Sequence, residues 1–192
     1  MRRELVFLLE ERSAKVMLES FLPRILDEQI EFKLIAFEGK QDLEKRMTMR
    51  MQGYLNTDAR FIVMRDQDSD PDCKALKARL LGKCQDSGKA NHALVRIACR
   101  ELETFYLADL QAVETALGVK GIRSKQQSAK FRNPDYLGSP SHELKVLSKF
   151  RYEKISGSRE IGRYLQVDNG RSASFRNLVE GIKRLEQELL SL

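Results

Sequence analysis

The chain has 192 residues, a formal net charge of +6 and a hydrophobic fraction of 42%, enough for a core without disulfide or metal staples. No apolar run approaches the roughly 20 residues that a membrane span needs, and the run from Leu5 to Leu9 meets Glu10 too soon to be a signal peptide. These properties predict a globular cytoplasmic protein that does not associate with membranes.

Apolar runs of strand length alternate with helical patterns along residues 1–118. We expect strands at Leu5–Leu9, Phe32–Phe37, Phe61–Met64 and Leu94–Cys99. Apolar residues at helical spacing predict helices at 14–25, 43–55 and 76–84, and a last one that is broken near Asp109 and ends at Gly118. Ser13 and Asp70 stand where helix caps belong, and Pro71 suits a first helical turn.

This order of elements predicts an α/β fold. Each connection between strands is long enough to carry a helix across to a parallel neighbour, whereas a hairpin fold has short turns. We therefore expect a doubly wound, mainly parallel four-stranded sheet in residues 1–118. The sequence contains no internal repeat and no glycine-rich loop of the Walker or dinucleotide-binding type.

Residues 119–192 differ from the first part in charge. They hold 15 Lys and Arg against 8 Asp and Glu, whereas residues 1–118 hold 19 against 20. We expect a polar loop from Lys120 to Ser139, a short helix after Pro140, a helix starting at Ser158 and a terminal helix from Ser174. This basic helical extension is predicted to pack on the sheet rather than to form an independent domain.

The basic extension favours a nucleic acid as partner. A basic segment beside a neutral domain is common in proteins that bind phosphate backbones, although a solvated surface has the same composition. Candidates for sequence-independent, salt-sensitive contacts are Lys120, Arg123, Lys125, Lys130 and Arg132 in the loop, and Arg65 and Arg100 at strand ends. For the two arginines at strand ends, pairing with nearby acids is the alternative interpretation.

Cysteine and histidine give no sign of a metal or catalytic centre. Cys73, Cys84 and Cys99 lack C-x-x-C spacing, and the simpler interpretation of Cys84 and Cys99 is that they are buried structural thiols. His92 and His142 stand far apart in the sequence. A disulfide framework, a thiolate zinc site and histidine-based catalysis are therefore not predicted.

Acidic residues follow three of the four expected strands. They are Glu10 and Glu11, Asp66 and Asp68, and Glu101 and Glu103. Ligands of an open parallel sheet bind outside the carboxyl ends of its strands, so these pairs are expected to meet there. Helix capping or solvated loops account for one or two such residues. Three pairs favour a site for Mg²⁺ or Mn²⁺, which take carboxylate oxygens as ligands and neutralise their repulsion.

Two of these pairs stand in recognisable motifs. Leu8-Leu9-Glu10-Glu11-Arg12-Ser13 resembles the first motif of Toprim domains, and Arg65-Asp66-Gln67-Asp68 resembles the second, the D-x-D at the end of strand three. With the segment from Arg100 to Asp109, most of the chain resembles a bacterial Toprim-related family of unassigned function. Members of that family are often encoded beside an ABC-type or SMC-like ATPase, in settings that indicate phage defence.

The resemblance implies roles for the acidic residues. Glu10 would be a metal ligand or general base, Asp66 and Asp68 would bind Mg²⁺, and Glu101 and Glu103 would be further ligands. Toprim domains occur in topoisomerases, primases and nucleases of the overcoming-lysogenisation-defect type. Many of them carry glycine after the first glutamate, often followed by a Ser-Asp pair. This chain has Glu11 in place of that glycine and Ala14 near the place of that aspartate.

Three functions are compatible with this pattern. The first is Mg²⁺-dependent phosphodiester hydrolysis on DNA or RNA, because the chain is too short for strand passage and shows no topoisomerase-like tyrosine nucleophile. The second is a catalytically silent Toprim-like subunit that binds an ATPase or a nucleic acid, which Glu11 and Ala14 favour. The third, a phosphoacceptor receiver domain, lacks a fifth strand with its lysine and leaves Asp68 without a role.

Overall fold

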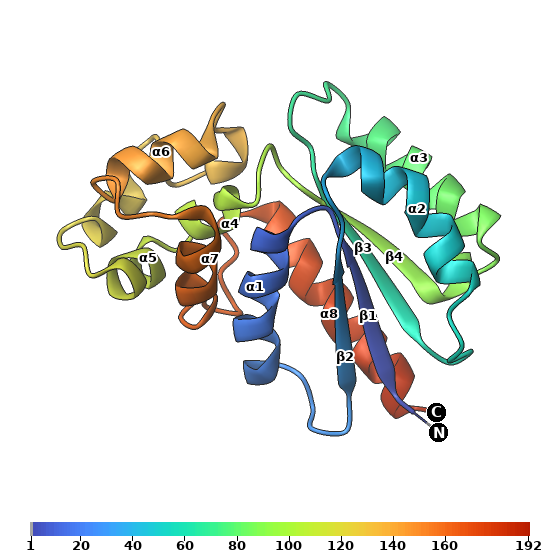
Figure 1. Cartoon of the computed structure of the whole chain (residues 1–192). Coiled ribbons are helices and arrows are strands. Elements are labelled where there is room, and N and C mark those ends of the chain that lie inside the picture. Colours follow the sequence, from blue (N-terminus) through green and yellow to red (C-terminus); the bar gives the residue numbers. More distant parts are fainter. Residues whose placement is uncertain (1) are drawn as a thin grey trace.

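The structure, a computed structural model that describes residues 2–192, contains one four-stranded sheet. Its strands are β1 (Glu4–Leu9), β2 (Glu31–Ala36), β3 (Arg60–Asp66) and β4 (Ala93–Ala98), in the order β2-β1-β3-β4 (Figure 1). All neighbouring strands run parallel. The predicted α/β sheet is confirmed, and each expected strand lies close to its observed bounds.

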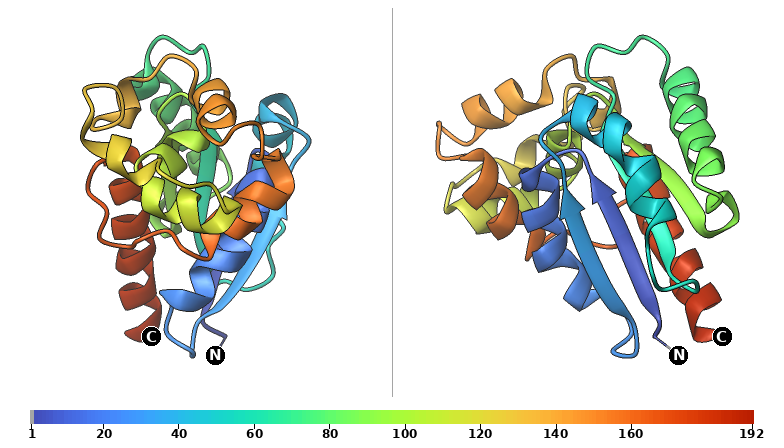
Figure 2. Two further views of the ribbon diagram at one scale, coloured as in Figure 1. Left: turned by 90° about the vertical axis from the view of Figure 1, so that its left-hand side faces the viewer. Right: turned by 45° about the vertical axis from the view of Figure 1, so that its right-hand side comes forward.

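Helices cover both faces of the sheet, as Figure 2 shows. They are α1 (Arg12–Phe21) and α8 (Ala173–Leu190) on one face, and α2 (Lys40–Gln52) and α3 (Cys73–Asp86) on the other. Successive strand residues point to opposite faces. Leu5 and Phe7 of β1 therefore enter the core under α1 and α8, while Val6 and Leu8 enter the core under α2 and α3. Burial on both faces explains why β1 is a continuous apolar run.

The remaining helices group on one side of the sheet (Figure 1). They are α4 (Glu103–Leu107), α5 (Leu110–Leu117), α6 (Pro140–Leu147) and α7 (Lys154–Gly162). Short 3₁₀ helices lie at Leu22–Arg24, Ala90–His92, Arg123–Gln127 and Pro134–Tyr136. One hydrophobic core joins these helices to β1 and α8, while a domain boundary at residue 118 stays a prediction. No helix in residues 2–192 is long and apolar enough to span a membrane.

The start of α3 differs from the prediction. Asp72 caps this helix by accepting hydrogen bonds from the backbone amides of Lys74 and Ala75, at 2.8 and 3.1 Å. Asp70, the expected cap, instead accepts a hydrogen bond of 3.1 Å from the guanidinium of Arg65. Asp70 is thus engaged by Arg65, and Asp72, which directly precedes the helix, takes the cap.

Two expected serine caps are also wrong. Ser13 lies inside α1, where its hydroxyl donates a hydrogen bond to the Glu11 carboxylate. Ser158 lies inside α7, and its hydroxyl donates to the carbonyl of Lys154 one turn earlier. A serine hydroxyl can bond within a helix as well as at its start, so the residue type alone does not fix the boundary. The predicted break at Asp109 is confirmed, because this residue caps α5.

A close contact between α1 and α7 gives a stability prediction. A Cβ atom at Gly162 of α7 would lie 2.5 Å from the carbonyl oxygen of Met17 in α1, whereas one at Gly82 of α3 would meet nothing within 4 Å. Gly162→Ala is therefore expected to lower the free energy of unfolding by about 1–3 kcal/mol. Gly82→Ala should raise it by about 0.5–1 kcal/mol. Thermal unfolding of both variants checks this, and equal shifts would show that α7 does not pack closely on α1.

Candidate metal centre

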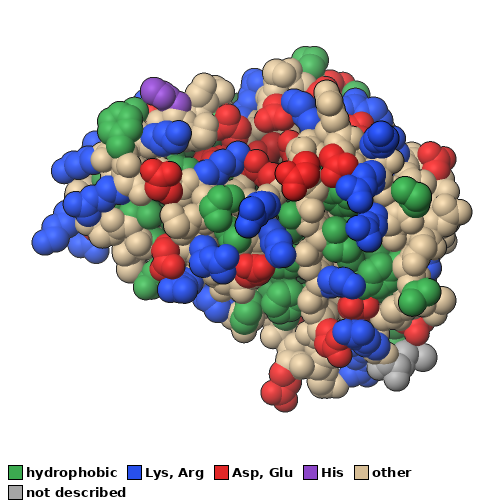
Figure 3. Space-filling model, viewed as in Figure 1, with side chains coloured by type: hydrophobic (Ala, Val, Ile, Leu, Met, Phe, Trp, Pro, Cys, Tyr) green, Lys and Arg blue, Asp and Glu red, His purple; other side chains and the backbone are tan. Residues whose placement is uncertain are grey.

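A hollow with a volume of about 300 Å³ opens at the carboxyl ends of β1, β3 and β4. The connections that follow β1 and β3 run to opposite sides of the sheet, so this is the topological switch point where such folds bind ligands. The hollow is lined by Glu10, Glu11, Asp66, Asp68, Glu101, Glu103, Ser141, Lys145, Tyr152 and Lys154. All six acidic residues expected at strand ends therefore meet here, and Figure 3 shows acidic side chains gathered across the middle of this face.

Glu10 and Asp66 are tied together through the backbone. The amide of Asp66, the last residue of β3, donates a hydrogen bond of 3.0 Å to Glu10 Oε2. Asp66 Oδ2 in turn accepts a 3.0 Å hydrogen bond from the amide of Leu102, which follows β4. The second oxygens, Glu10 Oε1 and Asp66 Oδ1, accept no hydrogen bond from residues 2–192. Each carboxylate is thus held at one oxygen and keeps the other available.

Glu103 is the third carboxylate with one fixed oxygen. It is the first residue of α4, its exposed fraction is only 1%, and its Oε1 accepts a hydrogen bond of 2.8 Å from the hydroxyl of Tyr152. The Tyr152 hydroxyl lies 3.2 Å from that of Ser158 in α7. A buried carboxylate with one neutral donor is poorly compensated, because burying a charge is costly unless it is paired.

Burial raises the pKa values of all three carboxyls. The pKa of Asp66 lies well above its usual range, first because of lost hydration and then because of the charges of Glu10 and Glu103. Burial also raises the pKa of Glu10, against the hydrogen bond from the Asp66 amide, and that of Glu103, against the bond from Tyr152. A cation near these carboxylates would favour their charged forms.

Strained backbone connects the loops after β3 and β4. Asp68 and Arg100 have φ angles of 52° and 62°, in the left-handed region, and the Asp68 amide donates a 2.7 Å hydrogen bond to the Arg100 carbonyl. Such conformations cost about 1–3 kcal/mol each and cluster at functional sites. The adjacent Glu101 accepts a 2.7 Å hydrogen bond from the amide of Ser141, which fastens the start of α6 to this edge.

Lysine side chains balance part of the negative charge. Lys40 Nζ lies 2.9 Å from Asp68 Oδ2, and Lys154 Nζ lies 2.7 Å from Glu11 Oε2. The hydrogen bond to Asp68 raises the pKa of Lys40. Burial lowers the pKa of Lys154, but its hydrogen bond to Glu11 and the surrounding negative charge outweigh burial, so the pKa is raised. Lys145 also lines the hollow and makes no ion pair within residues 2–192.

The cations of this site and Tyr152 were not predicted from the sequence. Lys40 could have been, because it follows β2 closely and the rule on strand ends applies to cations as well as to acids. Lys145, Tyr152 and Lys154 come from α6, α7 and the segment between them. No local pattern shows that these distant residues fold back over the end of the sheet.

Arg65 has a structural role. Its side chain is 3% exposed, its guanidinium lies 2.5 Å from Glu44 and 3.1 Å from Asp70, and its Nε lies 3.8 Å from Glu10. Arg65 therefore pairs with nearby acids, as the alternative interpretation expected, and its contact with nucleic acid stays an untested prediction that this burial disfavours. Arg100 is exposed and stays a candidate for contact with a phosphate backbone.

The predicted basic loop has an ordered framework. The buried side chain of Gln126 donates hydrogen bonds to the carbonyls of Leu107 and Phe131, at 3.0 and 2.8 Å. The exposed cations of this loop are Lys120, Arg123, Lys125, Lys130 and Arg132. Arg123 lies 3.7 Å from Glu114, Lys130 lies 2.6 Å from Glu143, and none of the five lines the hollow. Their contact with nucleic acid stays a prediction.

The donor chemistry of the hollow fits a divalent cation such as Mg²⁺ or Mn²⁺. Among residues 2–192, no group of three or more Asp, Glu, His or Cys side chains is already arranged to hold a metal ion. Glu10, Asp66 and Glu103 each keep one free oxygen of the hard type that these cations take. Binding therefore requires these side chains to turn toward the cation.

Comparison with known proteins agrees with this architecture. Residues 9–183 match the family described as Domain of unknown function (DUF4276). The chain belongs to the DUF4276 family. No curated protein gives a significant match.

Solved structures show the same fold as this DUF4276 chain. The C-terminal region of the Burkholderia pseudomallei OLD protein matches with a TM-score of 0.60 at 14% identity, over 98% of this chain and 99% of that one. The C-terminal region of the Xanthomonas campestris pv. campestris OLD protein matches with a TM-score of 0.52 at 12% identity, over 97% of this chain and 95% of that one. Because the likeness extends over nearly the whole of each chain, α4 to α7 belong to the shared fold.

Proposed function

We propose that this DUF4276 chain is a divalent-metal-dependent nuclease that hydrolyses phosphodiester bonds of DNA or RNA in the cytoplasm. The observation that carries the proposal is the group of Glu10, Asp66 and Glu103, three carboxylates at the switch point of the sheet whose pKa values burial raises and which each keep a free oxygen. The Toprim motifs and the OLD-like fold support it, because Toprim domains occur in nucleases of that type.

In this proposal Glu10, Asp66 and Glu103 hold Mg²⁺ or Mn²⁺. The cation would polarise the phosphodiester and lower the pKa of an attacking water. Asp68 and Glu101 are further ligands, but each has another partner. Lys40 partly neutralises the charge of Asp68 through Oδ2, and Glu101 holds the amide of Ser141 through Oε2, so each would bind the cation through its other oxygen.

The lysines of the hollow would bind the substrate. Lys145 has no competing carboxylate, and its amine is free to contact a phosphate oxygen. Lys154 is held near Glu11 and supplies a second positive charge beside the acidic group. Exposed Arg100 and the basic loop would extend this contact along the backbone, in a way that does not depend on sequence and weakens with salt.

A cleavage assay tests the proposal. The protein is incubated with labelled single-stranded and double-stranded DNA and RNA, in Mg²⁺, in Mn²⁺ and in excess EDTA. Cleavage of at least one substrate with metal, and none in EDTA, is the expected result. Absence of cleavage with every substrate and metal would contradict it, provided that thermal unfolding shows the protein to be folded.

The second candidate function is a catalytically silent subunit that binds an ATPase or a nucleic acid. The ion pairs of Glu11 with Lys154 and of Asp68 with Lys40 favour it, because cations of the chain already occupy part of the acidic group. This candidate predicts that the protein binds its partner equally well with and without Asp66→Ala, and cleaves nothing.

We also propose that the chain acts beside an ABC-type or SMC-like ATPase in phage defence. The basis is the family resemblance of the motifs at Glu10 and Asp66. Co-expression of the chain with an ATPase encoded next to it should yield a complex that co-purifies. Elution of the chain and this ATPase as two separate proteins at every salt and nucleotide concentration would contradict this association.

A further inference from the structure

One edge of the sheet is closed by the chain itself. At β4, the carbonyl of Val95 accepts a hydrogen bond of 3.0 Å from the side chain of Arg96. The guanidinium of Arg96 also donates to the carbonyl of Asn177 in α8, at 2.7 Å. Just beyond the strand, the amide of Cys99 donates a 3.3 Å hydrogen bond to the hydroxyl of Ser174. Polar groups along this edge are thus used within the molecule, which prevents another strand from adding there.

The opposite edge, β2, is open. The amides of Glu31 and Phe37 each donate a 2.9 Å hydrogen bond toward β1, to the carbonyl of Arg3 just before that strand and to that of Leu9 at its end. In a parallel pair the residues that bond to one neighbour alternate with residues that face away from it. The outward amides and carbonyls therefore belong to Phe32, Leu34 and Ala36. None of them has a hydrogen-bond partner in residues 2–192.

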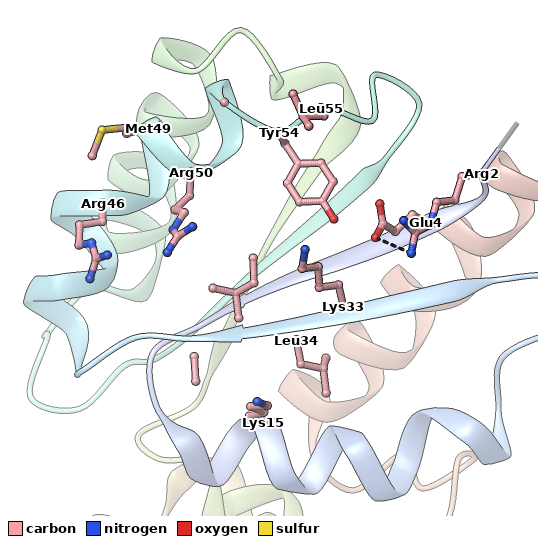
Figure 4. Close-up of a pocket in the computed structure, with 13 residues that line it drawn as sticks. Arg2, Glu4, Lys15, Lys33, Leu34, Arg46, Met49, Arg50, Tyr54 and Leu55 are labelled. Carbon is pink, nitrogen blue, oxygen red and sulfur yellow. Dashed lines mark ion pairs between the residues drawn. The ribbon is translucent and has the colours of Figure 1, made fainter.

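A hollow of about 880 Å³ runs along this open edge, as Figure 4 shows. Residues Lys33 to Ala36 of β2 line it, together with residues of α2 and of the loop after α2. Two apolar side chains stand out among them, because the exposed fraction is 67% for Met49 and 96% for Leu55. A strand laid along β2 would cover backbone groups and apolar side chains together.

The hollow is strongly basic. Its charged residues are Arg2, Lys15, Lys33, Arg46 and Arg50, with Glu4 as the one acid among the lining residues. Lys33 and Arg50 are exposed and make no ion pair within residues 2–192. The amine of Lys33 lies 5.5 Å from the ring centre of Tyr54, and Figure 4 shows it beside that ring. This charge is complementary to an acidic segment.

We propose that β2 binds an extended acidic segment of a partner protein, which adds to the sheet as a fifth strand. Backbone hydrogen bonds to Leu34 and Ala36 would align the segment, and its carboxylates would pair with Lys33 and Arg50. A second copy of this chain fits less well, because pairing of β2 with β2 brings the same cations together. A nucleic acid strand would satisfy the charge but not the row of backbone donors and acceptors.

Synthetic peptides test the mode of binding. The probe is a fluorescent peptide of alternating glutamate and valine, long enough to run along β2, and the readout is fluorescence anisotropy. Two derivatives carry N-methyl groups on alternate amides, one on each set. Because only one set of amides faces β2 in an added strand, one derivative should lose at least tenfold in affinity while the other binds like the parent peptide. Equal affinities of the two derivatives would overturn the proposal.

Charge-reversal variants locate the binding surface. Lys33→Glu/Arg50→Glu should weaken binding of the glutamate-valine peptide at least tenfold, about 1.4 kcal/mol. Lys74→Glu/Lys77→Glu changes the net charge equally but alters exposed residues of α3, beside the closed β4 edge, and should leave the affinity unchanged. Equal losses in both variants would overturn the proposal, because they would reflect net charge alone.

The same proteins, the wild type and Lys33→Glu/Arg50→Glu, also test two other possible occupants of the β2 edge. Stronger binding of an oligothymidylate than of the glutamate-valine peptide, lost in Lys33→Glu/Arg50→Glu, would show a nucleic acid surface and overturn the proposal. Sedimentation that shows a dimer disrupted by the same variant would show a second copy on β2 and also overturn it. All of these measurements are independent of cleavage, so they stand or fall separately from the proposed nuclease activity.

Discussion

Glu10→Gln and Asp66→Asn are each expected to reduce metal-dependent cleavage by about 10³-fold or more, which corresponds to about 4 kcal/mol of transition-state stabilisation. Each change keeps the shape of the side chain and an oxygen that can accept the bond from Asp66 N or Leu102 N. What it removes is the negative charge that holds the cation. Initial rates of cleavage at saturating Mn²⁺ measure the effect.

Two further variants make this comparison specific. Asp168→Asn alters an exposed aspartate outside the hollow, and its rate should equal that of the wild type. Asp68→Asn should cost less than Asp66→Asn, because Asp68 is partly neutralised by Lys40 at 2.9 Å. Wild-type rates in Glu10→Gln and Asp66→Asn would contradict the assignment of these carboxylates to the reaction.

Because of Glu10, Asp66 and Glu103, the metal-free protein is expected to become less stable as pH rises. The pKa values of Asp66, Glu10 and Glu103 are raised in the folded state, chiefly by burial. The folded state therefore binds these protons more tightly than the unfolded state does. The stability that this gives is fully present below the ordinary pKa values of the unfolded state, and it is lost as pH rises from there through the raised values of the folded state.

Asp66→Asn removes the most strongly shifted of these groups. In EDTA the variant should unfold several degrees above the wild type at neutral pH, and the difference should shrink toward the ordinary aspartate pKa of about 3.9. With Mn²⁺ at 100 times its dissociation constant the wild type should gain about 2.7 kcal/mol, or roughly 5–10 °C, and the variant almost nothing. Thermal unfolding from pH 4 to 8 measures both effects.

The matched control is again Asp168→Asn, which should follow the wild type at every pH and metal concentration. An Asp66→Asn variant that is less stable than the wild type in EDTA at neutral pH would contradict the account. It would mean that the Asp66 charge contributes more through its hydrogen bond to the Leu102 amide than it costs through burial and repulsion.

Most of the sheet could be predicted because its signals are local. The run from Leu5 to Leu9 is apolar at every position, as a strand buried on both faces requires. The order of strands and helices then limits the topology, since crossovers between parallel strands are right-handed. Helix starts were harder, because Asp70 and Ser13 formed other hydrogen bonds that depend on the folded chain.

The acidic half of the site could also be predicted from the sequence, because Glu10 and Asp66 lie at the ends of strands. The basic half was not, since Lys154 and Tyr152 reach the hollow only when α7 packs along α1 and closes over it. The role of Arg65 could not be decided from the sequence either. Its position beside two aspartates fits either phosphate or carboxylate as partner, and only its burial decides between them.

The open edge at β2 could not be inferred from the sequence. The segments of β2 and β4 are similar in length and apolar content, yet Arg96 and Ser174 close one edge while nothing in residues 2–192 covers the other. The difference arises because the C-terminal helix α8 lies beside β4. This free, basic edge is what the proposed binding of an acidic segment requires.

Calorimetric titration of Mn²⁺ into the wild type and into Glu10→Gln/Asp66→Asn tests the central claim most directly. Manganese takes the same oxygen ligands as magnesium and binds such sites more tightly. We predict saturable binding to the wild type and none to the variant, whose fold is checked by thermal unfolding. Equal heats in both proteins, or no binding to the wild type, would contradict the assignment of this acidic hollow as a metal centre.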